Sequence, residues 1–176
     1  MKNISLFFIL IFIYSFFVSC EDSNKKIYNV PFGSSREELV TQFEKFNMFP
    51  DSTSKQTKVV YNHGKYDFGG FVWDEIEVYF SRDDKFGLIR FCKKFDNPQK
   101  ALKSFEDLKQ TLSLKYELKL EKSVIGEKDI LVGRINRRNF SIVCYNDTIK
   151  DSLETTYYNY LQYEDKNYHS RPYEEL

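Results

Sequence analysis

The chain has 176 residues, with 26 basic residues, 26 acidic residues and a formal net charge of zero at pH 7. This length suits one domain with a single core. Because the charges balance, no strong positive field exists to attract a nucleic acid, and a nucleic-acid partner is not expected.

The first 20 residues, MKNISLFFILIFIYSFFVSC, have the pattern of an export signal that ends at a cysteine. Lys2 precedes an apolar stretch over residues 4–18, which is short for a membrane span and is followed by acidic residues. Val18-Ser19-Cys20 at its end resembles the bacterial lipobox, whose cysteine becomes the acylated first residue of the mature protein. A cleaved signal without lipid and an uncleaved anchor are the alternatives.

We therefore predict a lipoprotein signal peptide over residues 1–19, followed by a lipidated Cys20 and a polar tether up to residue 29. Two or more acyl chains hold a small domain stably on a bilayer, so the lipid bilayer is a predicted partner. The Phe- and Ile-rich signal resembles those of Bacteroidetes lipoproteins. This resemblance implies the bacterial cell envelope, lipid-anchored on the periplasmic or surface face of the outer membrane.

The mature chain then shows a first helix and three strands. A serine at 34 or 35, a glutamate three residues later and the spacing of Leu39, Phe43 and Phe46 predict a helix over 35–46. Alternating or β-branched residues predict strands over 57–67, 71–81 and 86–95, with a hairpin turn over 82–85.

A second helix and further strands complete the domain. Asn97 as N-cap and Pro98 at the first helical position predict a helix over 98–115. Strands are then predicted over 116–125, 129–136, 139–146 and 154–163. The order α-β-β-β-α-β-β-β-β indicates an α+β fold, a mainly antiparallel sheet with two helices packed on one face. The single domain is expected over 30–165, with a flexible tail over 166–176.

Two segments carry a resemblance to known proteins. Residues 30–39, VPFGSSREEL, are similar to the opening of small exported bacterial lipoproteins, and so are residues 71–80, FVWDEIEVYF, followed by GLIRF at 87–91. The pattern resembles the α+β folds of BamE-type outer-membrane assembly lipoproteins and of β-lactamase-inhibitor-like modules. Those families bind proteins and are not enzymes, which implies the same for this chain.

Alternation along residues 71–81 separates an apolar row from an aromatic row. Phe71, Trp73 and Tyr79 share the side opposite the predicted core row. An exposed row of such rings would offer a contact surface for a protein or a glycan. The alternative is that a helix or loop covers these rings.

No constellation in the sequence carries recognisable chemistry. The two histidines, His63 and His169, are remote from each other and from any Cys-x-x-Cys pair, so neither a metal nor a cofactor is predicted. Glu75 and Glu77 would lie about 7 Å apart on one strand face, where alternating charges are usually solvated.

Cys92 and Cys144 remain once Cys20 carries lipid. Cys92 shares a strand face with Arg90 and Lys94, whereas Cys144 lies on an apolar face. A disulfide is open to an exported protein, but two free thiols are the default prediction.

The sequence thus predicts a membrane-anchored, non-catalytic protein-interaction module that contacts another envelope or surface protein. The alternative is a glycan-binding accessory lipoprotein that uses Trp73 and its aromatic neighbours.

Overall fold

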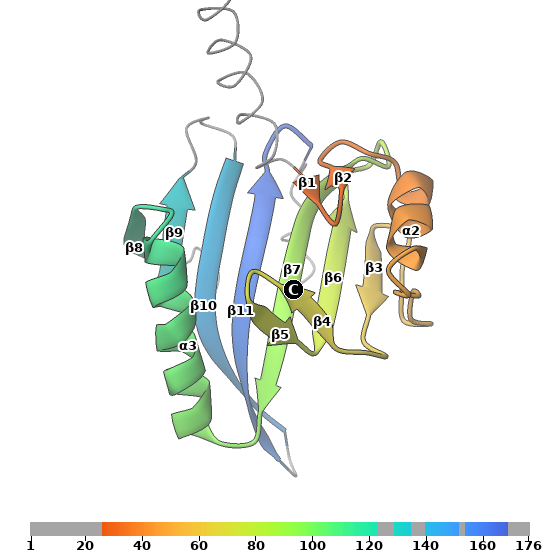
Figure 1. Cartoon of the computed structure of the whole chain (residues 1–176). Coiled ribbons are helices and arrows are strands. Elements are labelled where there is room, and N and C mark those ends of the chain that lie inside the picture. The colour runs from red at the N-terminus through yellow and green to blue at the C-terminus, as the bar shows by residue number, and fades with distance from the viewer. Residues whose placement is uncertain (1–25, 123–128, 135–139, 152–153, 169–176) are drawn as a thin grey trace, which may run out of the picture.

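The computed structural model describes residues 26–122, 129–134, 140–151 and 154–168. Within these ranges the chain forms a seven-stranded sheet, two short hairpins and two helices (Figure 1). The predicted α+β class, mainly antiparallel sheet with two helices, is therefore confirmed. The predicted signal peptide, Cys20 and the tail beyond Tyr168 lie outside the described residues.

The main sheet is antiparallel throughout, with the strand order β3-β6-β7-β11-β10-β9-β8. Its strands are β3 (Lys58–Tyr61), β6 (Glu75–Phe80), β7 (Phe86–Phe95), β8 (Leu118–Lys122), β9 (Asp129–Arg134), β10 (Phe140–Lys150) and β11 (Thr155–Asp165). The two hairpins are β1 (Lys26–Ile27) with β2 (Val30–Pro31), and β4 (Tyr66–Phe68) with β5 (Phe71–Trp73).

Helix α2 (Arg36–Glu44) begins at the predicted capping box. The Glu38 backbone N–H donates to Ser35 Oγ at 3.2 Å, and the Ser35 N–H donates to Glu38 Oε2 at 2.9 Å. The helix ends in a Schellman turn, because the Met48 N–H donates to the Phe43 carbonyl at 3.1 Å and Asn47 takes a positive φ of 57°.

Helix α3 (Pro98–Ser113) begins as its sequence predicts. Asn97 Oδ1 accepts from the Gln99 N–H at 2.8 Å and from the Lys100 N–H at 3.1 Å. Its buried Leu108 and Leu112 belong to the same core cluster as Leu39 of α2. This cluster also takes in side chains from the central strands β6, β7, β10 and β11, which ties both helices to the main sheet.

The strands predicted over 57–67 and 71–81 are each interrupted. Residues 66–73 leave the main sheet and form the hairpin β4–β5, which turns at two glycines with positive φ, Gly69 and Gly70. Asp74 then separates β5 from β6: its N–H donates to the Cys92 carbonyl at 2.9 Å. The order of elements therefore has five strands between the helices, where three were expected.

The described domain extends beyond residues 30–165 at both ends. Ile27, expected in the tether, is only 3% exposed and lies in the core cluster. Tyr168, expected in the tail, lies against Gly33, where an added Cβ would lie 2.7 Å from Tyr168 Cζ. Gly33 also has a φ of 91°, so both its conformation and this close contact favour glycine.

Candidate functional site

The aromatic row of Phe71, Trp73 and Tyr79, one of the contact surfaces considered from the sequence, is largely buried. Trp73 is 1% exposed and Tyr79 is 8% exposed, while Phe71 is half-buried. Of the two alternatives stated for this row, the covered one therefore holds for Trp73 and Tyr79.

The interruption at Asp74 explains why Trp73 is buried. It breaks the alternation of the strand, so the Trp73 ring enters the core cluster together with Ile76. There its centroid lies 5.7 Å from that of Phe91, and its Nε1–H donates to the Phe68 carbonyl at 3.0 Å. The glycan-binding alternative, which relied on an exposed Trp73, loses its surface.

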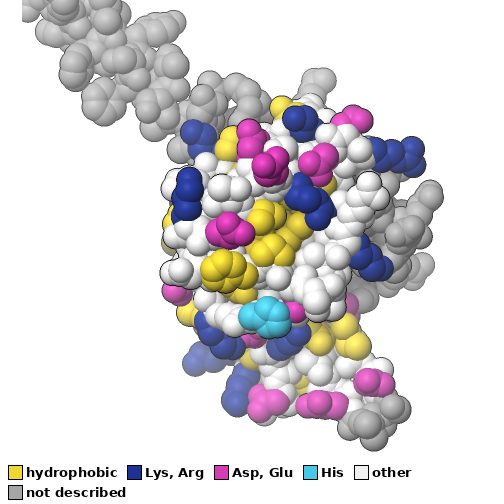
Figure 2. Space-filling view, turned by 90° about the vertical axis from the view of Figure 1, so that its right-hand side faces the viewer, with side chains coloured by type: hydrophobic (Ala, Val, Ile, Leu, Met, Phe, Trp, Pro, Cys, Tyr) yellow, Lys and Arg dark blue, Asp and Glu magenta, His cyan; other side chains and the backbone are white. Residues whose placement is uncertain are grey.

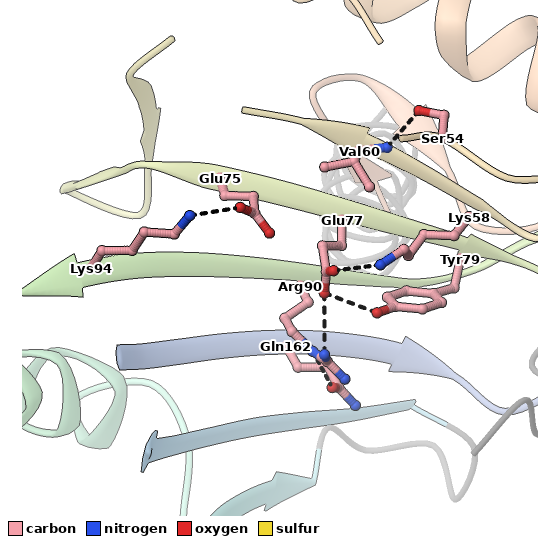
Figure 3. Close-up of polar contacts among 9 residues, drawn as sticks. All are labelled: Ser54, Lys58, Val60, Glu75, Glu77, Tyr79, Arg90, Lys94 and Gln162. Carbon is pink, nitrogen blue, oxygen red and sulfur yellow. Dashed lines mark hydrogen bonds and ion pairs between the residues drawn. The ribbon is translucent and has the colours of Figure 1, made fainter. Parts of the chain in front are cut away.

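Tyr79 is buried on the other side of the sheet, in a charged cluster that crosses four strands (Figure 3). The cluster consists of Lys58, Glu77, Tyr79, Arg90 and Gln162. Glu77 accepts from Lys58 Nζ at 2.8 Å, from Tyr79 Oη at 2.9 Å and from Arg90 Nη1 at 3.1 Å. The Arg90 guanidinium carbon lies 5.4 Å from the centroid of the Tyr79 ring, an arrangement that favours cation–π attraction.

The charge state of Glu77 follows from these contacts. Burial acts to raise the pKa of its carboxyl group, but the charges of Arg90 and Lys58 and the hydrogen bonds outweigh it, so the pKa lies below its ordinary value. Glu77 is thus an anion at neutral pH and is not poised as a general acid. Glu75, its neighbour on this side, pairs with Lys94 at 3.1 Å. Both carboxylates therefore stabilise strand pairing.

A pocket of about 490 Å³ is the candidate functional site. It lies between the end of α2, the turn of the β1–β2 hairpin and the start of β4. Figure 2 shows this side of the molecule, where hydrophobic side chains gather beside a histidine. The residues that line the pocket are Tyr28, Phe46, Asn47, Met48, Phe49, His63, Gly64, Lys65, Tyr66 and Asp67.

Local turns present the aromatic side chains of this pocket. The Schellman turn at Asn47 directs Met48 into the core, whereas Phe46 stays 43% and Phe49 58% exposed. Opposite them, Tyr28 has a φ of 50° in its hairpin turn, and its hydroxyl donates to the Asp67 carbonyl at 2.9 Å. Burial and nearby Asp67 raise the pKa of Tyr28 to about 12, so the ring is neutral.

Two of the polar side chains that line the pocket, His63 and Lys65, are held by carboxylates. Asp51 is buried and accepts from the Thr53 N–H at 2.7 Å, and hydrogen bonds from Thr53 lower the pKa of its carboxyl group. His63 Nε2 lies 2.7 Å from Asp51 Oδ2, and Lys65 pairs with Asp74. With His63 and Lys65 held in these contacts and the aromatic rings of Phe46 and Phe49 exposed, the pocket suits an apolar side chain of a partner.

Sequence reasoning missed this pocket. It assigned Phe46 to the buried stripe of α2, but the helix ends before this residue. The available signal was Phe-Asn-Met-Phe-Pro over 46–50, since asparagine readily takes the positive φ that ends a helix. Among the described residues, no group of three or more potential metal ligands is found.

Cys92 and Cys144 are both free and buried, which confirms the prediction of two free thiols. They lie on opposite faces of the sheet. Cys144 belongs to the core cluster, whereas Cys92 lies on the other face, where Glu75 and Tyr160 are its cross-strand neighbours. Cys92 is nevertheless only 2% exposed, so its side of the sheet is less solvated than the sequence predicts.

Comparison with protein families, curated proteins and solved structures gives no match for this chain. Within the described part of the chain, no helix is long and apolar enough to cross a membrane.

Proposed function

We propose that this protein is a lipid-anchored, non-catalytic interaction module of the bacterial envelope, which contacts another envelope or surface protein through the aromatic pocket. The observation that carries this proposal is the exposure of Phe46 and Phe49 beside a pocket of about 490 Å³. Exposed aromatic rings at the rim of a pocket are typical of the anchor points of protein interfaces.

The proposal includes the arrangement expected from the sequence, in which both helices pack on one face of the main sheet. Leu39 of α2 and Leu108 of α3 share one core cluster with Ile76, Phe91 and Ile142 of the sheet, which supports it. The resemblance to BamE-type and β-lactamase-inhibitor-like modules, which bind proteins, also agrees with this function. The glycan-binding alternative is not carried forward, because Trp73 is buried.

The anchor is tested at Cys20. In cells grown with an alkyne-labelled fatty acid, the full chain is expected to become labelled and to stay with the membrane fraction. The Cys20→Ser variant should lose the label, whereas the Cys92→Ser variant should keep it, because Cys92 is buried in the domain. Equal labelling of the Cys20→Ser variant and the unmodified chain would rule out this anchor.

The contact surface is tested by site-specific photo-crosslinking of the full chain in its own envelope. A photoreactive phenylalanine analogue at Phe49 should give a discrete protein-sized adduct. At Leu102 of α3, which is 57% exposed but lies outside the pocket, it should not.

The second variant in this experiment is Phe46→Ser. This change removes one wall of the pocket at a position that is already 43% exposed, so the fold should persist. It should lower the yield of the adduct at Phe49 several-fold. The same adduct at Leu102, or a yield that Phe46→Ser leaves unchanged, would contradict the proposed surface.

A further inference from the structure

The two ends of the main sheet differ in how their edges are covered. At one end, the outer edge of β3 is covered by the preceding loop: the Asp51 N–H donates to the Val60 carbonyl at 2.7 Å, and the Val60 N–H donates to Ser54 Oγ at 3.0 Å (Figure 3). At the other end, no segment within the described ranges pairs with the outer edge of β8. A sheet edge of this kind is a template for another strand.

One leucine of β8 packs against the domain and the other is exposed. Leu118 packs over β9 at Gly133, where an added Cβ would lie 3.0 Å from Leu118 Cδ2. Leu120, two residues along and therefore on the same side of the strand, is 67% exposed. The strand is thus fixed to the domain at one end and leaves an apolar side chain uncovered at its centre.

The sequence of β8, Leu-Lys-Leu-Glu-Lys, is complementary to itself when it is read antiparallel. Centred on Leu120, this pairing sets Leu120 opposite its copy and Lys119 opposite Glu121, twice by symmetry. A parallel pairing in register would instead oppose lysine to lysine and glutamate to glutamate. Opposite charges across a strand pair stabilise it and like charges destabilise it, so the antiparallel arrangement is favoured.

We propose that β8 is the contact surface of a homodimer, in which two copies pair antiparallel about Leu120 and join their sheets into one. Such a contact is isologous, the form that closes a two-fold dimer. Within one copy, Glu121 pairs with Arg134 at 3.1 Å and Lys119 with Glu117 at 3.3 Å. These pairs are exposed and contribute little stability, so little free energy is lost when contacts across the dimer replace them.

The size of the contact sets the expected strength of the dimer. An edge of only five residues makes a small contact, so a weak dimer is expected in dilute solution. Confinement on a membrane raises the effective concentration of the copies. That last point rests on the proposed lipid anchor, whereas the pairing of the strands does not.

Covalent trapping tests the register in the full chain. Residues directly opposite in an antiparallel pair have Cα atoms about 4.5–5.5 Å apart, which a disulfide can join. The Leu120→Cys variant should therefore give a disulfide-linked dimer under mild oxidation. The matched control is Ile149→Cys, 47% exposed at the far end of β10, which should stay monomeric. The unmodified chain, with its native cysteines, gives the background.

A charge exchange tests the proposed partner of Lys119. In the Leu120→Cys background, Lys119→Glu sets like charges opposite each other and should lower the dimer yield by about threefold to tenfold. Adding Glu121→Lys should restore the yield, because the two opposite-charge pairs are re-formed with their signs exchanged. Trapping needs no membrane, so a failure of the lipid anchor would leave these results unchanged. A Leu120→Cys yield equal to that of Ile149→Cys, or no recovery in the exchanged variant, would overturn the dimer.

Discussion

Truncating Trp73 to alanine is expected to lower the free energy of unfolding by about 3–5 kcal/mol, the usual loss for a large aromatic side chain removed from a core. The ring is 1% exposed and packs against Phe91 and Phe71. Its removal also leaves the Phe68 carbonyl without its indole donor. Circular dichroism during chemical denaturation is the suitable measurement, because Trp73 is the only tryptophan and its fluorescence is lost with it.

Two matched variants separate the contributions to this effect. Trp73→Phe keeps an aromatic ring but loses the hydrogen bond, so an intermediate loss is expected. Val72→Ala, one residue earlier and 43% exposed, should change the stability by no more than about 0.5 kcal/mol. If Trp73→Ala were no more destabilising than Val72→Ala, the burial of this ring and the turn at Asp74 would both be refuted.

Removing either partner of the Glu77–Arg90 ion pair is expected to destabilise the domain, by up to about 3–5 kcal/mol, because a buried charge then loses one of the groups that compensate it. In the Arg90→Leu variant Lys58 still pairs with Glu77 at 2.8 Å, which limits the loss. The side chains of Arg90 and Glu77 are 10% and 12% exposed, and their charged atoms lie 3.1 Å apart. The Glu77→Leu and Arg90→Leu variants should each show this loss. The loss of unfolding free energy in the double variant should be smaller than the sum of the losses in the two single variants. A double-mutant cycle measures this difference.

The same cluster is expected to contribute to the response to acid. The pKa of Glu77 is lowered in the folded protein, so its contribution to stability is complete above the ordinary value of 4.5 and is lost as the pH falls through the folded value. The double variant should therefore lose less stability between pH 5 and pH 3 than the unmodified protein.

The control for the acid response is Glu75→Leu. Its partner Lys94 is 47% exposed, so removing this pair should change the stability by no more than about 1 kcal/mol. A double variant with an unchanged acid response would show that Glu77 does not govern it.

Local signals in the sequence predicted the elements that are stabilised locally. The capping box at Ser35 and the Asn97-Pro98 pair fixed the starts of both helices, because each cap is formed by residues within one helical turn. The α+β class followed from the same patterns. These features need no information from distant parts of the chain.

The burial of Trp73 and the aromatic pocket could not be predicted in this way, because both depend on contacts between residues far apart in the sequence. The Asp74 N–H donates to the Cys92 carbonyl, and the Asp74 carboxylate accepts from the Lys94 N–H at 2.8 Å. These two bonds to β7 interrupt the strand, so Trp73 lies on the core side and not on the side that simple alternation predicts. The pocket likewise combines Tyr28 with segments 46–49 and 63–67. Neither arrangement leaves a periodic pattern in the sequence.

The two buried cysteines have a consequence for biogenesis. Burial raises the pKa of both the Cys92 and Cys144 thiols to about 12, so almost no thiolate is available for exchange in the folded state. Before folding, both thiols are accessible to oxidants. Folding itself therefore ends their reactivity, and the domain needs neither an oxidase to complete its structure nor an isomerase to correct it, provided that it folds faster than it is oxidised.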